Sequence, residues 1–279
     1  MCGVTGSRRS TANDGASRTF VLEERIRYGY SEPVTDLHQR LKIVPPLAQG
    51  CQRRRRWCLA VYGVQSSTTR TFLDSFGNLT IDVHVPRVDD AVEFVLNVEA
   101  ESRGSGRPYD SVVDRRYLHR TALTTPDDFI TEMAAGIGGD DVATLCARVY
   151  TSIIYEWGVT DVRTTASEAL AAGAGVCQDY AHIMLAACRI VGLAARYVSG
   201  HLRGEGGSHA WVEVLRPHPC RPDTWTAEGW DPTHNRPVNA DYLVVATGRD
   251  YADTAPLSGS YQGGNATNTL AVNKRLDLT

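Results

Sequence analysis

The sequence contains no run of about 18 consecutive apolar residues, the length that a membrane-spanning helix requires. Its first 18 residues include three arginines and no apolar block, so they do not resemble a secretory signal, and we expect residues 1–18 to be disordered. The seven cysteines are irregularly spaced and odd in number, which does not fit a disulfide framework. These absences predict a cytoplasmic protein with reduced thiols and no membrane association.

Lysine is nearly absent, because Lys42 and Lys274 are its only occurrences and arginine carries the other basic charges. The formal net charge of −3 disfavours a general affinity for polyanions. The one basic block is the run of four arginines at 53–56. It could contact phosphate, but we favour a solvated loop between two strands and expect no nucleic-acid partner.

Short metal-binding motifs are also missing. No C-x-x-C or H-x-x-x-H pair occurs, and the tight HPC sequence at 218–220 stands alone. Zinc sites usually show such pairs. The sequence therefore predicts no metal and no other cofactor.

Alternating apolar residues dominate the front third of the chain. Every second side chain is apolar in LTIDVHV at 79–85 and in VEFVLNVE at 92–99, and TFVLEERIRYGY at 19–30 is a further strand candidate. A period of two with turn residues in between predicts antiparallel strands with one buried face. We therefore expect an antiparallel β-sandwich-like domain over residues 19–110, followed by a linker at 111–125.

The pattern changes after Pro126. Apolar residues follow helical spacing over 140–157, a capped segment covers 165–173, and a helix is expected from Cys177 to about Val191. Strand-like segments come next, namely ARYVSGHL, HAWVEVL and YLVVATG. Helices followed by strands indicate an α+β domain, which we place at 126–279.

One cysteine of this second domain lies where chemistry can occur. Cys177 follows the glycine-containing sequence AGAGV and opens the expected helix, whereas Cys188 falls on its apolar side. The free N–H groups and the positive dipole end of a helix N-terminus favour a thiolate. The residues alone leave three interpretations open: a core thiol, a metal ligand or a nucleophile.

A nucleophilic thiolate needs an imidazole, and a carboxylate usually orients that imidazole. Downstream, His209 begins an alternating strand after the RGEGG loop, and Asp231 lies between Trp230 and Pro232. Spacing alone makes this grouping a suggestion, because one cysteine followed by histidines and aspartates is common by chance.

Three separated segments resemble the transglutaminase-like superfamily in their order and spacing, namely GVCQDYAHIMLAACRIVGLAARYVSGHL, SHAWVEV and GWDPTHN. They are most similar to bacterial members with an N-terminal β domain, and residues 26–46 look like the opening of that domain. The resemblance implies a papain-like transglutaminase core. In it, Cys177 would be the nucleophile, His209 the base and then the acid, and Asp231 the orienting carboxylate.

The sequence identifies the residues that would contact the substrate or the oxyanion less clearly than it identifies Cys177, His209 and Asp231. The backbone N–H of Cys177 is one expected oxyanion donor. The candidates for further substrate or oxyanion contacts are Gln178, Trp157 and Trp211, with Tyr155 beside them. We expect His182 to be a structural helix histidine and Asp179 to cap the first turn.

The implied activity is acyl transfer from a peptide or protein amide through a thioester. Water as the acceptor gives a protease or amidase, and an amine gives a protein cross-linking transglutaminase. We favour hydrolysis, because the sequence shows no recognisable lid to exclude water. A non-catalytic peptide-binding scaffold of the same fold is a further alternative.

Overall fold

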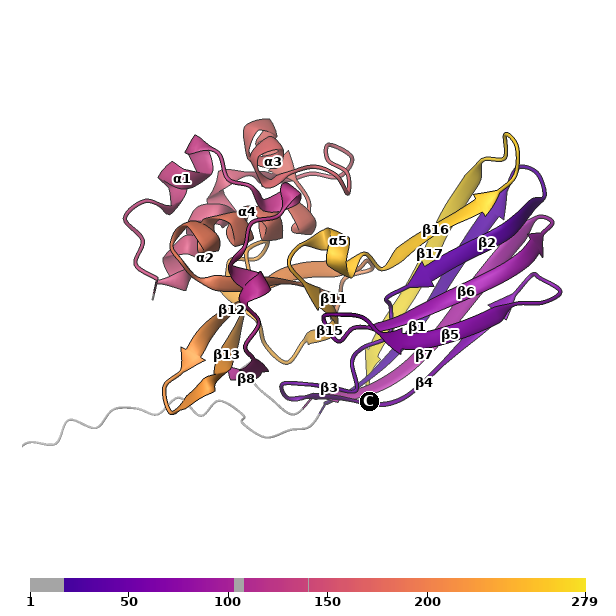
Figure 1. The fold of residues 1–279 in the computed structure, drawn as a ribbon, viewed down its shortest axis with the longest axis horizontal. Helices are drawn as coiled ribbons and strands as arrows, with labels where there is room; N and C mark the ends of the chain where they lie inside the picture. The colour runs from indigo at the N-terminus through magenta and orange to yellow at the C-terminus, as the bar shows by residue number, and fades with distance from the viewer. Residues whose placement is uncertain (1–17, 103–107, 140) are drawn as a thin grey trace, which may run out of the picture.

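The computed structural model describes residues 18–102, 108–139 and 141–279, so residues 1–17 of the expected disordered start lie outside the described part. An elongated β-sandwich lies beside a domain of helices and strands (Figure 1). The expected α+β class with an N-terminal β region is confirmed. Among the described residues, no helix is both long and apolar enough to cross a membrane.

The sandwich consists of two antiparallel sheets, one in the order β17-β1-β7-β4-β3 and the other in the order β16-β2-β6-β5. Alternate side chains such as Phe20, Ile81 and Phe94 are fully buried between them, as the sequence pattern predicts. The strands are β1 Arg18–Tyr30, β2 Val34–Leu41, β3 Ala48–Gln49, β4 Gln52–Tyr62, β5 Thr68–Leu73, β6 Leu79–Val88, β7 Ala91–Ser102, β16 Leu257–Gln262 and β17 Asn268–Leu278.

The last two strands differ from the expected domain boundary. Strand β17 pairs with β1 along its length, from Phe20↔Leu278 to Tyr30↔Asn268, and β16 pairs with β2. Residues 257–278 therefore belong to the sandwich and not to a second domain running to 279. They complete the sheets at edges of β1 and β2 that would otherwise carry unpaired backbone groups.

The second domain has a sheet in the order β14-β13-β12-β11-β15, with β8 paired to β13. The long helix α4 packs against β11 and β12, and α1, α2 and α3 pack against α4. Its elements are β8 Tyr109–Val112, η1 Arg115–Leu118, η2 Ala122–Thr124, α1 Asp128–Ala134, α2 Val142–Ser152, β9 Ile154–Tyr155, α3 Ala166–Ala172, β10 Ala174–Gly175, α4 Cys177–Ile190, β11 Ala194–Leu202, β12 His209–His218, β13 Arg221–Asp231, β14 Arg236–Pro237, β15 Tyr242–Gly248 and α5 Tyr251–Thr254.

Strand β8 also corrects the expected linker. Tyr109 lies in the range assigned to the β domain, yet its strand pairs with β13. The Tyr109 hydroxyl donates to Glu213 over 2.7 Å, and Glu213 forms a buried ion pair with Arg196, also 2.7 Å long. The chain therefore enters the second domain before residue 111.

The arginine block lies within β4 and not in a solvated loop, so that expectation was wrong. Arg55 pairs with Glu101, and Arg56 Nη2 lies 2.7 Å from Glu99 Oε2 on the neighbouring strand β7. Arg54 Nη1 donates to the Pro45 carbonyl over 2.6 Å. Cross-strand carboxylates on β7 thus compensate part of this basic charge.

Two buried amide side chains join the sandwich to strand β15, which is the edge strand of the second sheet. Asn78 donates to the Thr247 carbonyl and accepts from the Thr247 N–H, each over 2.8 Å. Gln52 makes the same pair of contacts with Val244, at 2.9 and 2.8 Å. These amides satisfy edge groups that burial would otherwise leave unpaired.

Candidate active site

Cys177 is the first residue of α4, and the approach to it is tightly held. The Asp179 carboxylate turns back and accepts from the Val176 N–H and from the Thr160 hydroxyl, each over 2.7 Å, which confirms the expected cap. A β-carbon on Gly175 would lie 2.6 Å from the same carboxylate, so this position needs glycine. The half-buried thiol is therefore fixed at the end of a helix that is otherwise almost wholly buried.

His209 opens β12 and is buried. Its Nε2 lies 2.8 Å from Asp231 Oδ2, and the ring also interacts with the Cys177 side chain. Burial lowers the pKa of His209, but the interactions of its ring with the side chains of Asp231, Cys177 and Glu205 outweigh burial and raise this pKa to about 11. The imidazole next to the thiol is accordingly held as an imidazolium at neutral pH.

Asp231 ends β13 and has no exposed surface. Its Oδ2 is also 2.8 Å from His234 Nδ1 and accepts from the Tyr242 hydroxyl over 2.6 Å. Its Oδ1 accepts the backbone N–H of Thr233 over 2.9 Å. Burial raises the pKa of Asp231, but the hydrogen bonds from His209 and His234 outweigh it and hold this pKa well below its usual value.

Glu205 joins this group from the turn between β11 and β12, and sequence reasoning missed it. Its Oε2 lies 3.2 Å from His209 Nδ1, and its Oε1 lies 3.3 Å from His234 Nε2. The glycine-rich RGEGG loop before His209 was the only signal for it. Tyr242 was missed as well, since nothing in YLVVATG marks a contact to Asp231.

The three candidate substrate contacts differ in their burial and in their partners. Trp211 has no exposed surface and stacks 6.1 Å behind the His209 ring, so it supports the imidazole and the expectation of substrate contact is wrong for it. Gln178 is buried, and its amide donates to the Asp161 carbonyl over 3.0 Å, which ties the helix start to a loop. Trp157 is 76% exposed and meets Tyr155 edge-on at 6.1 Å.

An open cavity of about 360 Å³ lies beside this group, between the two domains. Trp157, Gly207 and Ser208 line it from the second domain, and Glu24 and Lys274 line it from the sandwich. Because Ser208 directly precedes His209, the cavity reaches the edge of the candidate site. The sandwich therefore contributes part of the surface of this cavity.

The remaining histidine and thiols nearby are structural. His182 is fully buried and accepts the Tyr251 N–H over 3.2 Å, and burial lowers its pKa to about 3. Burial likewise raises the pKa of the Cys146 and Cys188 thiols to about 12. Neither of these two thiols is ionised to a significant extent at neutral pH.

Glu205, His209 and His234 also form one of two groups among the described residues whose nitrogen and oxygen atoms are close enough to share a cation. Here the groups already form an acid–base network. A protonated His209 cannot act as a ligand, because a metal needs the neutral imidazole.

Comparison with known proteins gives two family matches. Residues 130–230 match the core of the transglutaminase-like superfamily, and residues 22–102 match the bacterial transglutaminase-like N-terminal region. A solved structure of a candidate cysteine protease from Cytophaga hutchinsonii has the same fold, with a TM-score of 0.73 at 19% identity over 94% of this chain and 91% of that chain.

Two mycobacterial relatives are uncharacterized proteins. The one from Mycobacterium tuberculosis is 41% identical over 126 residues, and the match spans 41% of this chain and 40% of the relative's length. The one from Mycobacterium leprae is 28% identical over 269 residues, 86% of this chain and 92% of the relative.

Proposed function

The chain is a transglutaminase-like superfamily protein, and from this we propose that it is a cysteine-dependent acyl-transfer enzyme that hydrolyses peptide or protein amides. One observation carries the proposal. The His209 imidazole pairs with the buried Asp231 carboxylate over 2.8 Å, and the Cys177 thiol at the start of α4 acts on the same ring and raises its pKa. Thiol, imidazole and carboxylate in this order make the nucleophile, base and orienting group of a catalytic triad.

The steps follow from these positions. The Cys177 thiolate attacks the amide carbonyl, and the backbone N–H of Cys177 is placed to stabilise the oxyanion. The His209 imidazolium then protonates the leaving amine as the C–N bond breaks, which leaves a thioester on Cys177. His209, now neutral, takes a proton from water, and the resulting hydroxide attacks the thioester carbonyl. The carbon–sulfur bond breaks, which releases the carboxylic acid and restores the Cys177 thiolate and the His209 imidazolium.

Asp231 has no direct contact with substrate in this scheme. Its Oδ2 holds the Nε2 side of His209, which leaves Nδ1, 3.2 Å from Glu205 Oε2, as the ring nitrogen that exchanges a proton with the thiol in this scheme. Because Asp231 is buried and ionised, it stabilises the imidazolium without an exchange of protons. Trp211 and Tyr242 pack around the ring and exclude water from the pair.

The experiment that tests this proposal offers a peptide library together with a labelled primary amine, and compares the protein with Cys177→Ala. We expect peptide cleavage or ammonia release without incorporation of the amine, and none of either in the variant. Incorporation of the amine would identify a protein cross-linking enzyme instead. Peptide binding without turnover in both proteins would contradict the proposal and favour a scaffold.

A further inference from the structure

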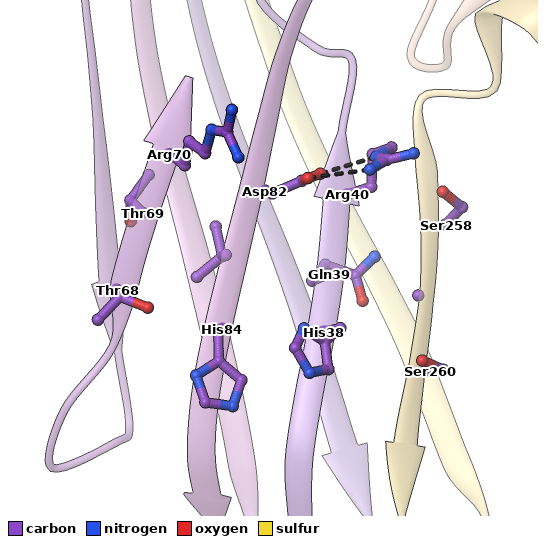
Figure 2. Close-up of a pocket in the computed structure, with 12 residues that line it drawn as sticks. His38, Gln39, Arg40, Thr68, Thr69, Arg70, Asp82, His84, Ser258 and Ser260 are labelled. Atoms are coloured by element: carbon purple, nitrogen blue, oxygen red, sulfur yellow. Dashed lines mark hydrogen bonds and ion pairs between the residues drawn. The ribbon is translucent and has the colours of Figure 1, made fainter. Parts of the chain in front are cut away.

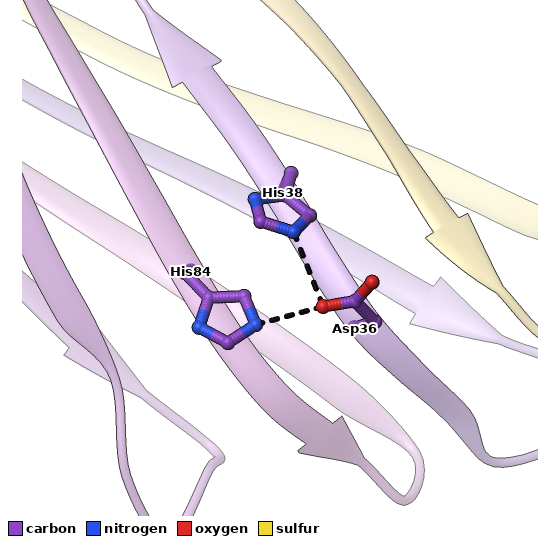
Figure 3. A group of neighbouring side chains, drawn as sticks. All are labelled: Asp36, His38 and His84. Atoms are coloured by element: carbon purple, nitrogen blue, oxygen red, sulfur yellow. Dashed lines mark hydrogen bonds and ion pairs between the residues drawn. The ribbon is translucent and has the colours of Figure 1, made fainter.

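Three chelating side chains lie together on the exposed face of the sheet β16-β2-β6-β5, in the β-sandwich (Figure 3). Asp36 and His38 come from β2, and His84 comes from β6. His38 and His84 are direct cross-strand partners, and their rings stack with centroids 4.6 Å apart and planes inclined by 27°. The proposed acyl-transfer chemistry uses none of the three.

The backbone at Asp36 has an uncommon shape. Its φ is 52°, in the left-handed region that residues other than glycine rarely adopt and that Asp and Asn tolerate best. The register of β16 against β2 shifts at the same place, between Ser260 and Gln262, as at a β-bulge. Bulges re-aim side chains, and a strained position within a regular strand indicates a local function.

The bulge places one carboxylate oxygen against both rings. Asp36 Oδ1 lies 3.1 Å from His38 Nε2 and 2.9 Å from His84 Nε2. Asp36 Oδ2 accepts from the Gln262 amide over 3.0 Å, which fixes the plane of the carboxylate.

We propose that Asp36, His38 and His84 bind a divalent transition-metal cation of the Zn²⁺ class. The three donor atoms lie within 4.8 Å of one another, and such a cation binds imidazole nitrogen and carboxylate oxygen at about 2.0–2.2 Å. Two nitrogens and one oxygen suit Zn²⁺, Co²⁺ or Ni²⁺, whereas Mg²⁺ and Ca²⁺ prefer oxygen alone. Three protein ligands leave a fourth position for water.

Binding replaces the two hydrogen bonds to Asp36 Oδ1. Each imidazole then offers its Nε2 lone pair to the cation, and any proton carried on Nε2 moves to Nδ1 or to solvent. Gln262 keeps its contact with the other carboxylate oxygen and acts as the residue that orients this ligand.

The charges near the cluster do not oppose a cation. The two histidines form one end of an open groove of about 400 Å³, and Arg40 lies farther along the same face (Figure 2). Arg40 forms two hydrogen bonds to Asp82, of 2.7 and 2.9 Å, so an adjacent carboxylate offsets its charge. Arg70 lies over the Phe72 ring, with its Cζ 5.7 Å from the ring centroid.

The expectation that the protein binds no metal rested on short cysteine and histidine motifs. Here the spacing D-x-H occurs on a strand, where a period of two puts both side chains on one face, and the third ligand comes from a different strand. The cross-strand register that unites them becomes visible only in the fold.

Calorimetric titration of the full chain with Zn²⁺ tests the site, after treatment with a chelator and alkylation of the accessible thiols. We expect one site whose affinity falls by about 100-fold or more in His38→Ala, in His84→Ala and in Asp36→Asn, and by about tenfold in Gln262→Ala. Asn retains the tolerance for the left-handed backbone, so Asp36→Asn tests the charge and not the bulge. Equal melting temperatures without metal verify that the variants fold.

Two control variants locate the binding. His119→Ala removes an exposed histidine outside both groups, and His234→Ala removes a member of the group around Glu205. We expect both to bind Zn²⁺ as the unmodified chain does. Absence of binding, or binding that survives in His38→Ala and His84→Ala but is lost in His234→Ala, would overturn the proposal.

Discussion

Asp231 combines complete burial with a full set of hydrogen-bond donors. Its Oδ2 lies within hydrogen-bond distance of the His209 and His234 rings and of the Tyr242 hydroxyl. Its Oδ1 accepts from the backbone N–H groups of Thr233 and His234. A buried carboxylate without such donors would become neutral. Because it stays ionised, Asp231 can stabilise the His209 imidazolium that the proposed mechanism requires.

Replacing Asp231 by Asn should lower kcat by about 10⁴-fold with a much smaller change in KM, because an amide neither stabilises the imidazolium nor enforces the tautomer. Steady-state kinetics on a peptide substrate from the library measure this. The matched control is Asp223→Asn, which changes an exposed aspartate of the same strand β13. Equal losses in both variants would assign the effect to the strand and not to the charge.

The raised pKa of His209 predicts a pH-dependent contribution to stability. A group whose pKa is higher in the folded state contributes its full stabilisation at pH values below its unfolded pKa, which is about 6.5 for histidine. The contribution of His209 is lost as the pH rises towards its folded pKa of about 11. In a Cys177→Ser background, which removes the titration of the thiol, His209→Ala should therefore destabilise more at pH 6 than at pH 9.

Urea unfolding at the two pH values gives the difference in the free energy of unfolding. Cys177→Ser/His119→Ala is the control, since His119 is exposed. A His209→Ala effect that is equal at both pH values, or larger at pH 9, would show that the folded protein does not favour the imidazolium.

At the scale of elements, the sequence predicted correctly the helices whose start and end are both fixed by neighbouring residues. The short helix α3 forms as expected, because Thr165 and Glu168 cap each other and Gly173 ends the helix at a φ of 69°. The expected helix over 140–157 instead ends at Ser152, since Ile154 and Tyr155 pair in parallel with Ala174 and Gly175. That pairing is non-local and leaves no trace in helical spacing.

The approach to α4 gives a prediction at this scale. Gly175→Ala should lower the free energy of unfolding by about 1–3 kcal/mol and reduce activity, because the new methyl group displaces the Asp179 carboxylate that holds Val176. Gly138→Ala is the control, since its β-carbon would have no neighbour within 4 Å. Denaturant unfolding and thiol kinetics measure the two effects. An active and fully stable Gly175→Ala would show that this cap is dispensable for placing Cys177.

At the scale of the whole molecule, the chain leaves the β-sandwich, builds the second domain and returns. Leu243 of β15 is fully buried in the sandwich core, so the two domains share apolar contacts. The return was not predictable, because the sequence of 257–278 reads equally well as further strands of the second domain. Pairing of β17 with β1 connects residues some 240 positions apart, as at Thr269↔Gly29.

Asn78→Ala should destabilise the protein by about 1–3 kcal/mol, because it leaves the buried N–H and C=O of Thr247 without their partners. Asn97→Ala, at an exposed position of β7, should change stability by less than about 0.5 kcal/mol. Thermal and urea unfolding check both values. A neutral Asn78→Ala would mean that water reaches β15 and that the domains are not tightly docked.

Residues of the candidate site were predictable where a distinctive local sequence surrounds them. They were not predictable where only the fold brings them to the site. Cys177, His209 and Asp231 each lie in a distinctive segment, and the structure brings the three together. Glu205 and Tyr242 reach the same point from a turn and from the edge strand β15. Trp211 was misjudged because strand alternation does not say which face is covered, and here Gly200 opens room for its ring beneath β11.

The most direct test of the central claim measures the alkylation rate of each thiol by iodoacetamide between pH 6 and pH 8. Cys51, Cys58 and Cys220 are exposed and serve as internal controls. An ordinary thiol gains about tenfold in rate with each pH unit below its pKa, because only the thiolate reacts. We predict that Cys177 reacts faster than these exposed thiols at pH 6, and that His209→Ala abolishes this advantage. If Cys177 instead reacts no faster than the exposed thiols at pH 6 and its rate rises with theirs, the account of Cys177 as an activated nucleophile is wrong.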